Sequence, residues 1–545
     1  MVATTDTIKI NNFGGGLNFR DDELNLEIGE TPKAQNIEIV RKTGLQKKAG
    51  YAPIFNKLPS NVNSAFADNY VDDDGNHHYV NVSYPDINLI DPITGAKNRI
   101  YSGLTFTGDP EGTEVNGSYI LADEVNDPVI ITKQTVTKIN WPPSYTFKNN
   151  EAGNLDQSNA AVSDNPSESS IGKPGIVVFH ANRIFLAGDK KNPRRIYASK
   201  IGDITNFSDN DPNEFDIAFF VDVPSQRPIT AMKVVSNEYL VIYCDTEIIL
   251  MTGEFPPGLN YPQPHFAFNT LNTSIGCLGK RLVAPKGDND HFFVSNRGRI
   301  FQLTLTQNFQ EVKPLGLTEK IFPLLAQYNN ATFKRGQLIN YQLRGELHFF
   351  LPSTNQRRYP DQDLILNYGD RNHSDVWSLD TGYVETTLIR STLIDSESNK
   401  MILVTPREFL ETNKGLNYNG APIETIYQTY TLDFGHPNNN KEINNITIYA
   451  RSVTGTKFSF LHTWESSDSG SEEVEIPANP DSFWGSADFG INDFYSSAGL
   501  PFQQKSFPIK NPMGKQLKIR IIHNSDDEDL TINAILIDFT LMGKD

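Results

Sequence analysis

The stretch HFFVSNRGRIFQLTL, residues 291–305, contains the pattern that decides the fold of this chain. Two runs rich in Phe, Val, Ile and Leu flank the short polar sequence Asn296–Arg297–Gly298. Aromatic and β-branched residues favour strands, and a Gly-containing break of this length favours a hairpin turn. The stretch therefore predicts two antiparallel strands joined by a tight turn.

The same pattern recurs along most of the chain. Further apolar runs, bounded by Asn, Asp, Gly and Pro, occupy residues 77–83, 175–180, 239–253, 342–353, 399–406, 442–452 and 515–543. Between about residues 170 and 430, groups of such runs return every 50 residues or so, roughly the spacing of four-stranded propeller blades. A chain of β-sandwiches would give a similar spacing, so periodicity alone leaves both arrangements open. In either case the fold class is mainly β.

Helical signals are few. Thr405, Pro406 and Glu408 form a capping pattern that predicts a helix over 405–412. Residues 31–37 begin with the same Thr-Pro pair and predict a second short helix. Residues 317–328 have a helical pattern that Pro323 is expected to break.

Composition divides the chain into four regions. Residues 149–173 have almost no large apolar side chains to bury, which predicts a polar surface loop. Before it we expect an N-terminal β region, 1–148, that holds a platform and the first propeller strands. After it we expect propeller repeats over 174–435 and a C-terminal β-sandwich over 436–545.

The charge balance bears on possible partners. Among 545 residues, 48 are Lys or Arg and 66 are Asp or Glu, which gives a formal net charge of −18. Affinity for DNA rises with the number of phosphates that basic side chains neutralise, so this chain is not built to hold a duplex tightly. An acidic wall would instead let DNA pass without sticking. Basic clusters at 41–48, 190–195 and 356–360 are interpreted as solvated turns or subunit contacts.

Targeting signals are also missing from the sequence. No run approaches the roughly 20 apolar residues that span a bilayer, and the first residues lack a signal-peptide pattern. Cys244 and Cys277 are the only cysteines. We therefore expect that the protein does not insert stably into a membrane. We also expect that it is synthesised in a reducing cytoplasm.

Candidate chemical motifs each have a structural explanation. The sequence SSDSG, 466–470, has the core of an Asp-box, which is a hairpin turn rather than a catalytic element. In VDDDGNHH, 71–78, the acidic residues miss the alternate positions of a calcium loop, so a polar hairpin tip is expected. The glycines of FGGGLNF, 13–19, lack the Lys-Ser/Thr of a phosphate loop and are expected to allow bending or close packing.

The candidate nucleophile and the candidate histidine bases are also interpreted as structural residues. Cys277 lies near His265 in sequence but has no evident third partner, which favours a free buried thiol. His180, His291 and His348 lie in or beside strands and are interpreted as structural. The sequence thus predicts no catalytic, cofactor-binding or metal-ligating residues and no cofactor, and we do not expect an enzyme.

Two segments resemble tail nozzle, tail tube or hub proteins of short-tailed bacteriophages. Residues 13–51 have a Gly-rich start, a Glu-x-x-x-Ala-x-Asn middle and a basic end between glycines, formed by Gly14–Gly16, Glu30, Ala34, Asn36, Gly44, Lys47 or Lys48, and Gly50. Residues 180–209 resemble a second segment of these proteins through Asn182, Arg183, Ser199, Gly202, Asp203, Asn206 and Phe207. Residues 292–303 resemble a later blade of the family.

The resemblance implies a ring, typically a hexamer, whose subunits are built around a β-propeller. We therefore expect a β-propeller core with a β-sandwich or platform region formed by the terminal segments. The implied function is structural: a homo-oligomeric nozzle or hub in the phage tail, assembled in the bacterial cytoplasm, that channels double-stranded DNA without sequence-specific binding. Its implied partners are the portal and adaptor proteins and the tail fibres or spikes.

Two other functions remain open from the sequence. A receptor-binding tail fibre or adhesin would favour trimers with repetitive shafts, which the sequence does not show. A propeller glycosidase or depolymerase would need two carboxylates facing each other across an open pocket.

Overall fold

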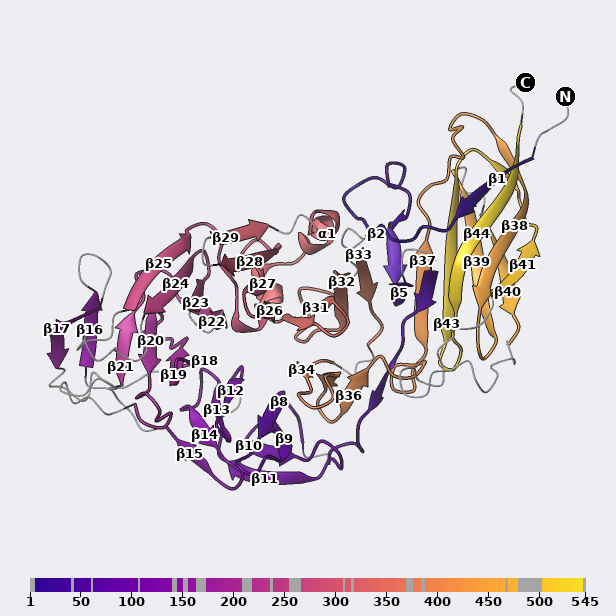
Figure 1. The fold of residues 1–545 in the computed structure, drawn as a ribbon. Helices are drawn as coiled ribbons and strands as arrows, with labels where there is room; N and C mark the ends of the chain where they lie inside the picture. The colour runs from indigo at the N-terminus through magenta and orange to yellow at the C-terminus, as the bar shows by residue number, and fades with distance from the viewer. Residues whose placement is uncertain are drawn as a thin grey trace.

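The computed structural model describes residues 5–40, 44–59, 62–105, 108–139, 145–149, 155–162, 173–207, 218–235, 239–253, 266–306, 309–314, 318–368, 376–383, 388–465, 469–478 and 502–542. They form a ring of β-sheets with a β-sandwich at its side (Figure 1). The middle of the chain builds the ring, and the two ends of the chain meet in the sandwich. The predicted β-propeller core with a sandwich formed by the terminal segments is confirmed.

Six blades of the propeller consist of consecutive antiparallel strands. The first two are β8–β11 (Phe66–Val71, His77–Ser83, Asp86–Ile90, Lys97–Ser102) and β12–β15 (Glu111–Val115, Ser118–Ala122, Val129–Ile131, Val136–Lys138). The next two are β18–β21 (Ile176–His180, Arg183–Ala187, Arg195–Ala198, Phe219–Asp222) and β22–β25 (Ile229–Val235, Tyr239–Cys244, Ile248–Gly253, Phe266–Asn272). The last two are β26–β29 (Val283–Lys286, Asp290–Val294, Ile300–Thr306, Phe309–Pro314) and β30–β33 (Gln337–Tyr341, Glu346–Leu351, Gln362–Asn367, Val376–Asp380).

A seventh sheet closes the ring with a strand from the N-terminal region. It contains β34 (Ser391–Ile394), β35 (Met401–Val404) and β36 (Phe409–Thr412), and β36 pairs with β7 (Tyr51–Pro53). The first strand of each sheet contacts the first strand of the next, in the circular order β8, β12, β18, β22, β26, β30, β34 and back to β8. These first strands therefore surround the propeller axis.

The hairpin at 291–305 has the predicted form. β27 pairs antiparallel with β28, with Phe293 opposite Phe301, and the turn between them contains Gly298 with a φ of +70°. Phe292, Phe293 and Val294 are all buried, because neighbouring blades cover both faces of this sheet. A strand covered on both faces is apolar at every position, which explains why the run in the sequence does not alternate.

The sandwich combines both ends of the chain. One sheet contains β1 (Thr5–Ile10), β5 (Ile37–Val40), β6 (Gly44–Lys47), β38 (Lys441–Arg451), β41 (Gln503–Phe507), β42 (Met513–Gly514) and β44 (Thr531–Leu541). The other contains β37 (Ile423–Gln428), β43 (Leu517–Ser525), β39 (Thr456–Trp464) and β40 (Ser469–Ile476). Their inward side chains form one apolar core that includes Ile446, Phe460, Ile519 and Ile537, as expected for two packed sheets.

One short strand joins the two parts. β4 (Lys33–Gln35) pairs with β33 of the propeller on one side and with β37 of the sandwich on the other. Through β4, blade β30–β33 and the sandwich sheet that contains β37, β43, β39 and β40 therefore form one continuous nine-stranded sheet.

Two of the helix predictions were wrong. At 405–412 the backbone N–H of Glu408 does bond to the Thr405 hydroxyl (3.0 Å), but the chain continues as β36. Residues 31–37 contain β4 and not a helix. In both places pairing with strands distant in sequence outweighs a local capping signal.

The remaining helical elements are short. α1 (Thr318–Leu325) forms at the third predicted position with Pro323 inside it, so the proline does not break the helix. α2 (Asn330–Phe333) and the 3-10 turn η1 (Lys280–Leu282) precede inner strands. No helix among the described residues is long and apolar enough to span a bilayer.

Two domain boundaries also differ from the prediction. Within the predicted loop at 149–173, residues Leu155–Val162 form β17, which pairs with β16 (Tyr145–Asn149). Residues 150–154 and 163–172 lie outside the described ranges. The sandwich begins before residue 436, because β37 pairs with β43 and β4. Backbone pairing placed β17 and β37 in sheets that composition does not reveal.

The close contact between Gly50 and the backbone near Asn417, next to β7, leads to a first prediction. A Cβ atom on Gly50, just before β7, would lie 1.8 Å from the carbonyl oxygen of Asn417. Hydrogen bonds between Gly50 and the segment at Lys414–Gly415 hold the two backbones together. We expect Gly50→Ala to lower the free energy of unfolding by about 2 kcal/mol or more, measured by urea denaturation.

The matched control is Gly279→Ala. Gly279 has extended backbone (φ −177°) and no atom within 4 Å of the added methyl position. Its unfolding free energy should stay within about 0.5 kcal/mol of wild type. Equal stability of Gly50→Ala and Gly279→Ala would show that ring closure does not depend on this contact.

Candidate functional site

The residues that carry the N-terminal resemblance lie where the propeller meets the sandwich. Asn36 is 1% exposed and has a φ of +53°. Its Oδ1 accepts hydrogen bonds from the Thr381 N–H (2.8 Å) and the Tyr418 hydroxyl (3.0 Å), and its Nδ2 donates to the Glu424 carbonyl (2.7 Å). The Asn36 side chain therefore links three parts of the chain: the end of β33, the segment that follows β36, and strand β37. We call this contact the Asn36 joint.

Other residues of this resemblance have similar roles. Glu30, in β3 (Glu30–Thr31), accepts from Asn18 (2.8 Å) and pairs with Lys320 of α1 (2.8 Å). Gly16, in β2 (Gly16–Leu17), has a φ of +66°, and a Cβ there would lie 2.8 Å from the Trp377 backbone nitrogen. The expectation that these glycines permit close packing is confirmed.

The second resembling segment forms the turns of blade β18–β21. Arg183 is buried and its guanidinium donates to the Ser199 carbonyl, while the Ser199 hydroxyl accepts from the Ile184 N–H (2.9 Å). The Gly202 N–H donates to the carbonyl of Asn182 (2.9 Å), and Phe207 is fully buried. These residues shape the blade.

The Asn36 joint can be tested by substitution. Asn36→Ala removes the three hydrogen bonds of the side chain, and alanine tolerates positive φ less well than asparagine. We therefore expect a loss of about 2–4 kcal/mol in the free energy of unfolding. Asn399→Ala is the control, since Asn399 has nearly the same φ (+54°) but is exposed. Subtracting the effect of the control removes the cost of alanine at positive φ, so the difference in urea denaturation reports the hydrogen bonds and packing of the Asn36 side chain. A difference near zero would contradict the proposed role of Asn36.

A buried ionic cluster lies beside this joint. His348 Nδ1 lies 2.7 Å from Asp363 Oδ2, and His348 Nε2 lies 3.3 Å from Glu346 Oε2. Arg344 bridges Glu346 (3.0 Å) and Glu38 (2.7 Å). Nearby, Lys48 pairs with Asp380 at 3.4 Å. The cluster connects β30–β33 with the N-terminal strands of the sandwich.

Burial and charge compete within the cluster. Burial alone would lower the pKa of His348, but the carboxylates of Asp363 and Glu346 outweigh it and raise the pKa to about 9. Burial raises the pKa of Asp380 to about 6 in spite of Lys48. Burial would also raise the pKa of Glu346, yet hydrogen bonding to His348 and nearby cations hold it below its usual value.

These carboxylates do not form a glycosidase site. The cavity beside them has a volume of about 20 Å³ and is lined by Lys48, His348, Asp363, Asp380, Tyr383 and Tyr418 among others. That volume holds about one water molecule and no sugar ring. The cluster is therefore a structural junction.

The raised pKa of His348 makes stability depend on pH. Protonated His348 stabilises the fold fully below about pH 6.5, and this stabilisation is lost as the pH rises through about 9. We expect the destabilisation caused by His348→Gln to shrink between pH 6.5 and 9, by on the order of 2–3 kcal/mol. His436→Gln, at an exposed histidine, is the control. A destabilisation by His348→Gln that stays constant across this range would contradict the assignment.

The remaining sequence candidates have structural roles. Residues 71–78 form the β8–β9 hairpin tip, where Asp72 accepts from the N–H groups of Asp74 and Asn76. Cys244 and Cys277 are free and buried, and burial raises their pKa values to about 11 and about 12. Burial lowers the pKa values of His180 and His291 to about 4. Among the described residues, no group of three or more His, Cys, Asp or Glu side chains could hold a metal ion.

Part of the predicted motifs lies outside the described residues. For SSDSG, 466–470, the flanking strands β39 and β40 pair as the expected hairpin, while residues 466–468, including Asp468, are not described. His265 and residues 41–43 are likewise outside the described ranges. In the cluster at 190–195, Arg195 pairs with Asp222 at 2.8 Å within the blade.

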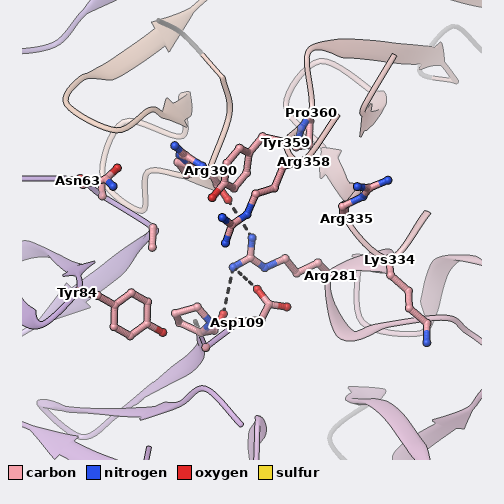
Figure 2. A pocket seen from close by; sticks show the side chains of 14 residues that line it. Asn63, Tyr84, Asp109, Arg281, Lys334, Arg335, Arg358, Tyr359, Pro360 and Arg390 are labelled. Atoms are coloured by element: carbon pink, nitrogen blue, oxygen red, sulfur yellow. Dashed lines mark hydrogen bonds and ion pairs between the residues drawn. The ribbon is translucent and has the colours of Figure 1, made fainter. Parts of the chain in front are cut away.

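A basic pocket opens at one mouth of the propeller (Figure 2). Its volume is about 520 Å³, and its cationic side chains are Arg281, Lys334, Arg335, Arg358 and Arg390. Among the described residues that line it, Asp109 is the one carboxylate. The lining comes from segments that lead into the inner strands β8, β12, β26, β30 and β34, together with the β9–β10 turn and the β31–β32 loop.

Two of the arginines gather around one aromatic ring. The guanidinium carbon of Arg390 lies 3.4 Å from the centre of the Tyr359 ring, and that of Arg358 lies 5.2 Å from it. Burial, and then the charge of Arg358, lowers the pKa of Arg390 to about 10. Arg281 is fixed differently, by Asp109 (2.6 Å) and by the Arg390 carbonyl (2.9 Å).

The sequence offered only a partial signal for this pocket. Arg358 belongs to the predicted basic cluster at 356–360, and it is exposed there as expected. Arg281 and Arg335 each follow a lysine, Arg390 has no basic neighbour, and the sequence did not identify the three as a group. Only the closure of the ring brings these distant positions together.

Comparisons with known proteins concern the fold alone. No protein-family model matches the sequence, and no curated protein matches it. Among solved structures, the WD40 β-propeller domain of Doa1 is 11% identical over 67% of this chain and 96% of that one, with a TM-score of 0.37. YCF48 bound to a D1 peptide is 10% identical over 66% and 94%, with a TM-score of 0.38. PorZ of Porphyromonas gingivalis is 11% identical over 69% and 42%, with a TM-score of 0.35.

Proposed function

We propose that this chain is a structural protein of a bacteriophage tail. It forms a homo-oligomeric ring, a hexamer by the resemblance, that acts as a nozzle or hub for double-stranded DNA during ejection. The ring docks to the portal–adaptor assembly and to tail fibres or spikes. It belongs to the virion, is assembled in the host cytoplasm and performs no catalysis.

One observation carries this proposal. The residues that resemble phage tail proteins hold the architecture: Asn36 ties propeller to sandwich, Gly50 seats the closing strand, and Arg183 with Ser199 shapes a blade. Positions that fix a two-part architecture are the ones a structural family would share. The formal charge of −18 agrees with a wall that DNA must slide past.

Exposed apolar side chains agree with subunit contacts. Leu24 and Ile28 are 56% and 72% exposed in the loop between β2 and β3, beside the joint. Glu23 in the same loop pairs with Lys518 of the sandwich, which anchors the loop. Paired exposed apolar residues on an anchored loop suit a protein interface.

Electron microscopy and native mass spectrometry of the purified protein test the proposal. We expect closed rings, either from the protein alone or after addition of portal–adaptor complexes. A double substitution, Leu24→Ser with Ile28→Ser, should weaken ring formation, while Ile93→Ser, at an exposed residue of the β10–β11 turn, should not. Monomers under all of these conditions would refute the proposal.

DNA binding supplies an independent check of the channel. At physiological salt we expect no measurable complex with duplex DNA in fluorescence anisotropy, because an acidic surface neutralises few phosphates. A tight complex whose affinity falls steeply with salt would contradict a sliding channel.

A further inference from the structure

The basic pocket at the propeller mouth has positive charge without matching negative charge. Within the part of the chain that the structure describes, Arg358, Arg390, Arg335 and Lys334 form no ion pair with a carboxylate, and Asp109 is engaged by Arg281. The chain as a whole carries an excess of acidic residues. Cations gathered at one site of an acidic protein repel one another and leave the site to be neutralised by something else.

The same pocket contains donors without acceptors. The Nε and Nη1 atoms of Arg390 and the Nε atom of Arg335 are buried and have no hydrogen-bond partner. Ser64 is fully buried, and its hydroxyl also lacks a partner. A buried polar atom without a partner costs about 1–3 kcal/mol, so these donors indicate a missing acceptor.

Size restricts what can supply that acceptor. A volume of about 520 Å³ lies within the usual range for small-molecule sites and is too small for a nucleic-acid duplex or a folded domain. A phosphate group carries nearly two negative charges at neutral pH, whereas a carboxylate carries one. Two or three phosphates therefore match the charge of this pocket within the space available. Guanidinium groups also bind phosphate oxygens through paired N–H donors.

We propose that this pocket binds a small compound with two or more phosphate groups. Arg358 and Arg390 contact the phosphates, and Tyr359 holds both guanidiniums in place (Figure 2). Arg281 has a positioning role, since Asp109 and backbone carbonyls occupy its donors. The site belongs to each subunit and does not depend on ring formation.

Isothermal titration calorimetry with inorganic tripolyphosphate, at constant ionic strength, tests the proposal. We expect saturable binding of one tripolyphosphate per chain and a rise in Tm on addition. Arg358→Gln and Arg390→Gln should each weaken binding by about tenfold or more. Arg357→Gln is the matched control, because Arg357 is adjacent in sequence but pairs with Asp361 (3.0 Å) and does not line the pocket.

The stability of the free protein provides a folding control. Without ligand, Arg358→Gln should be at least as stable as wild type, because it removes repulsion from Arg390. Retained stability with lost binding separates a binding role from a structural one. Equal weakening by Arg357→Gln would overturn the proposal.

Competing anions distinguish the ligand class. Citrate, hexaglutamate and a short DNA duplex are titrated under the same conditions, and each should bind at least about tenfold more weakly than tripolyphosphate. Tighter binding of citrate or hexaglutamate would assign the pocket to a carboxylate ligand and overturn the phosphate proposal. Displacement of tripolyphosphate by the duplex would assign it to nucleic acid, with the same consequence. Absence of saturable tripolyphosphate binding would also overturn it.

Discussion

The structure depends on how three residues of β4 pair. Gln35 lies opposite Leu379 of the propeller and opposite Ile426 of the sandwich, so one strand is shared by both parts. The next residue, Asn36, turns the chain with positive φ and bonds to groups on both sides. Ring closure follows at β7 (Tyr51–Pro53), where Gly50 packs against the backbone of Asn417. Both the ring and its attachment to the sandwich are therefore set by a short N-terminal segment.

A cluster of buried charged side chains stabilises the contact between propeller and sandwich and has no room for a substrate. The carboxylates around His348, together with Arg344 and Lys48, satisfy one another in a space that admits no substrate. Removing one partner from such a network leaves a buried charge uncompensated, which is strongly destabilising. The pocket at the propeller mouth has the opposite character. Four of its cationic side chains, Lys334, Arg335, Arg358 and Arg390, form no ion pair with a carboxylate of the described residues. The contrast separates a structural cluster from the proposed binding site.

Sequence patterns predicted several local features correctly. The hairpin at 291–305 was recognisable from its apolar runs and Gly298, since neighbours along the chain decide a tight turn. The capping signal at Thr405 was also present in the structure, but pairing of β36 with β7 and β35 decided its outcome. The blades β8–β11 and β12–β15 lie before residue 170, outside the range in which the strand groups showed a regular spacing. Their membership in the ring follows from contacts between inner strands.

Patterns in the sequence were enough to define the class of structure as mainly β, through its apolar runs and glycine turns, and to give the net negative charge. These properties depend on neighbouring residues or on total composition, so they do not depend on how the chain folds. Two features became evident only in three dimensions: Arg281, Arg358 and Arg390 line one pocket, and β4 pairs with both the propeller and the sandwich. These contacts join residues that are far apart in sequence. They form because the strands around the propeller axis close into a ring.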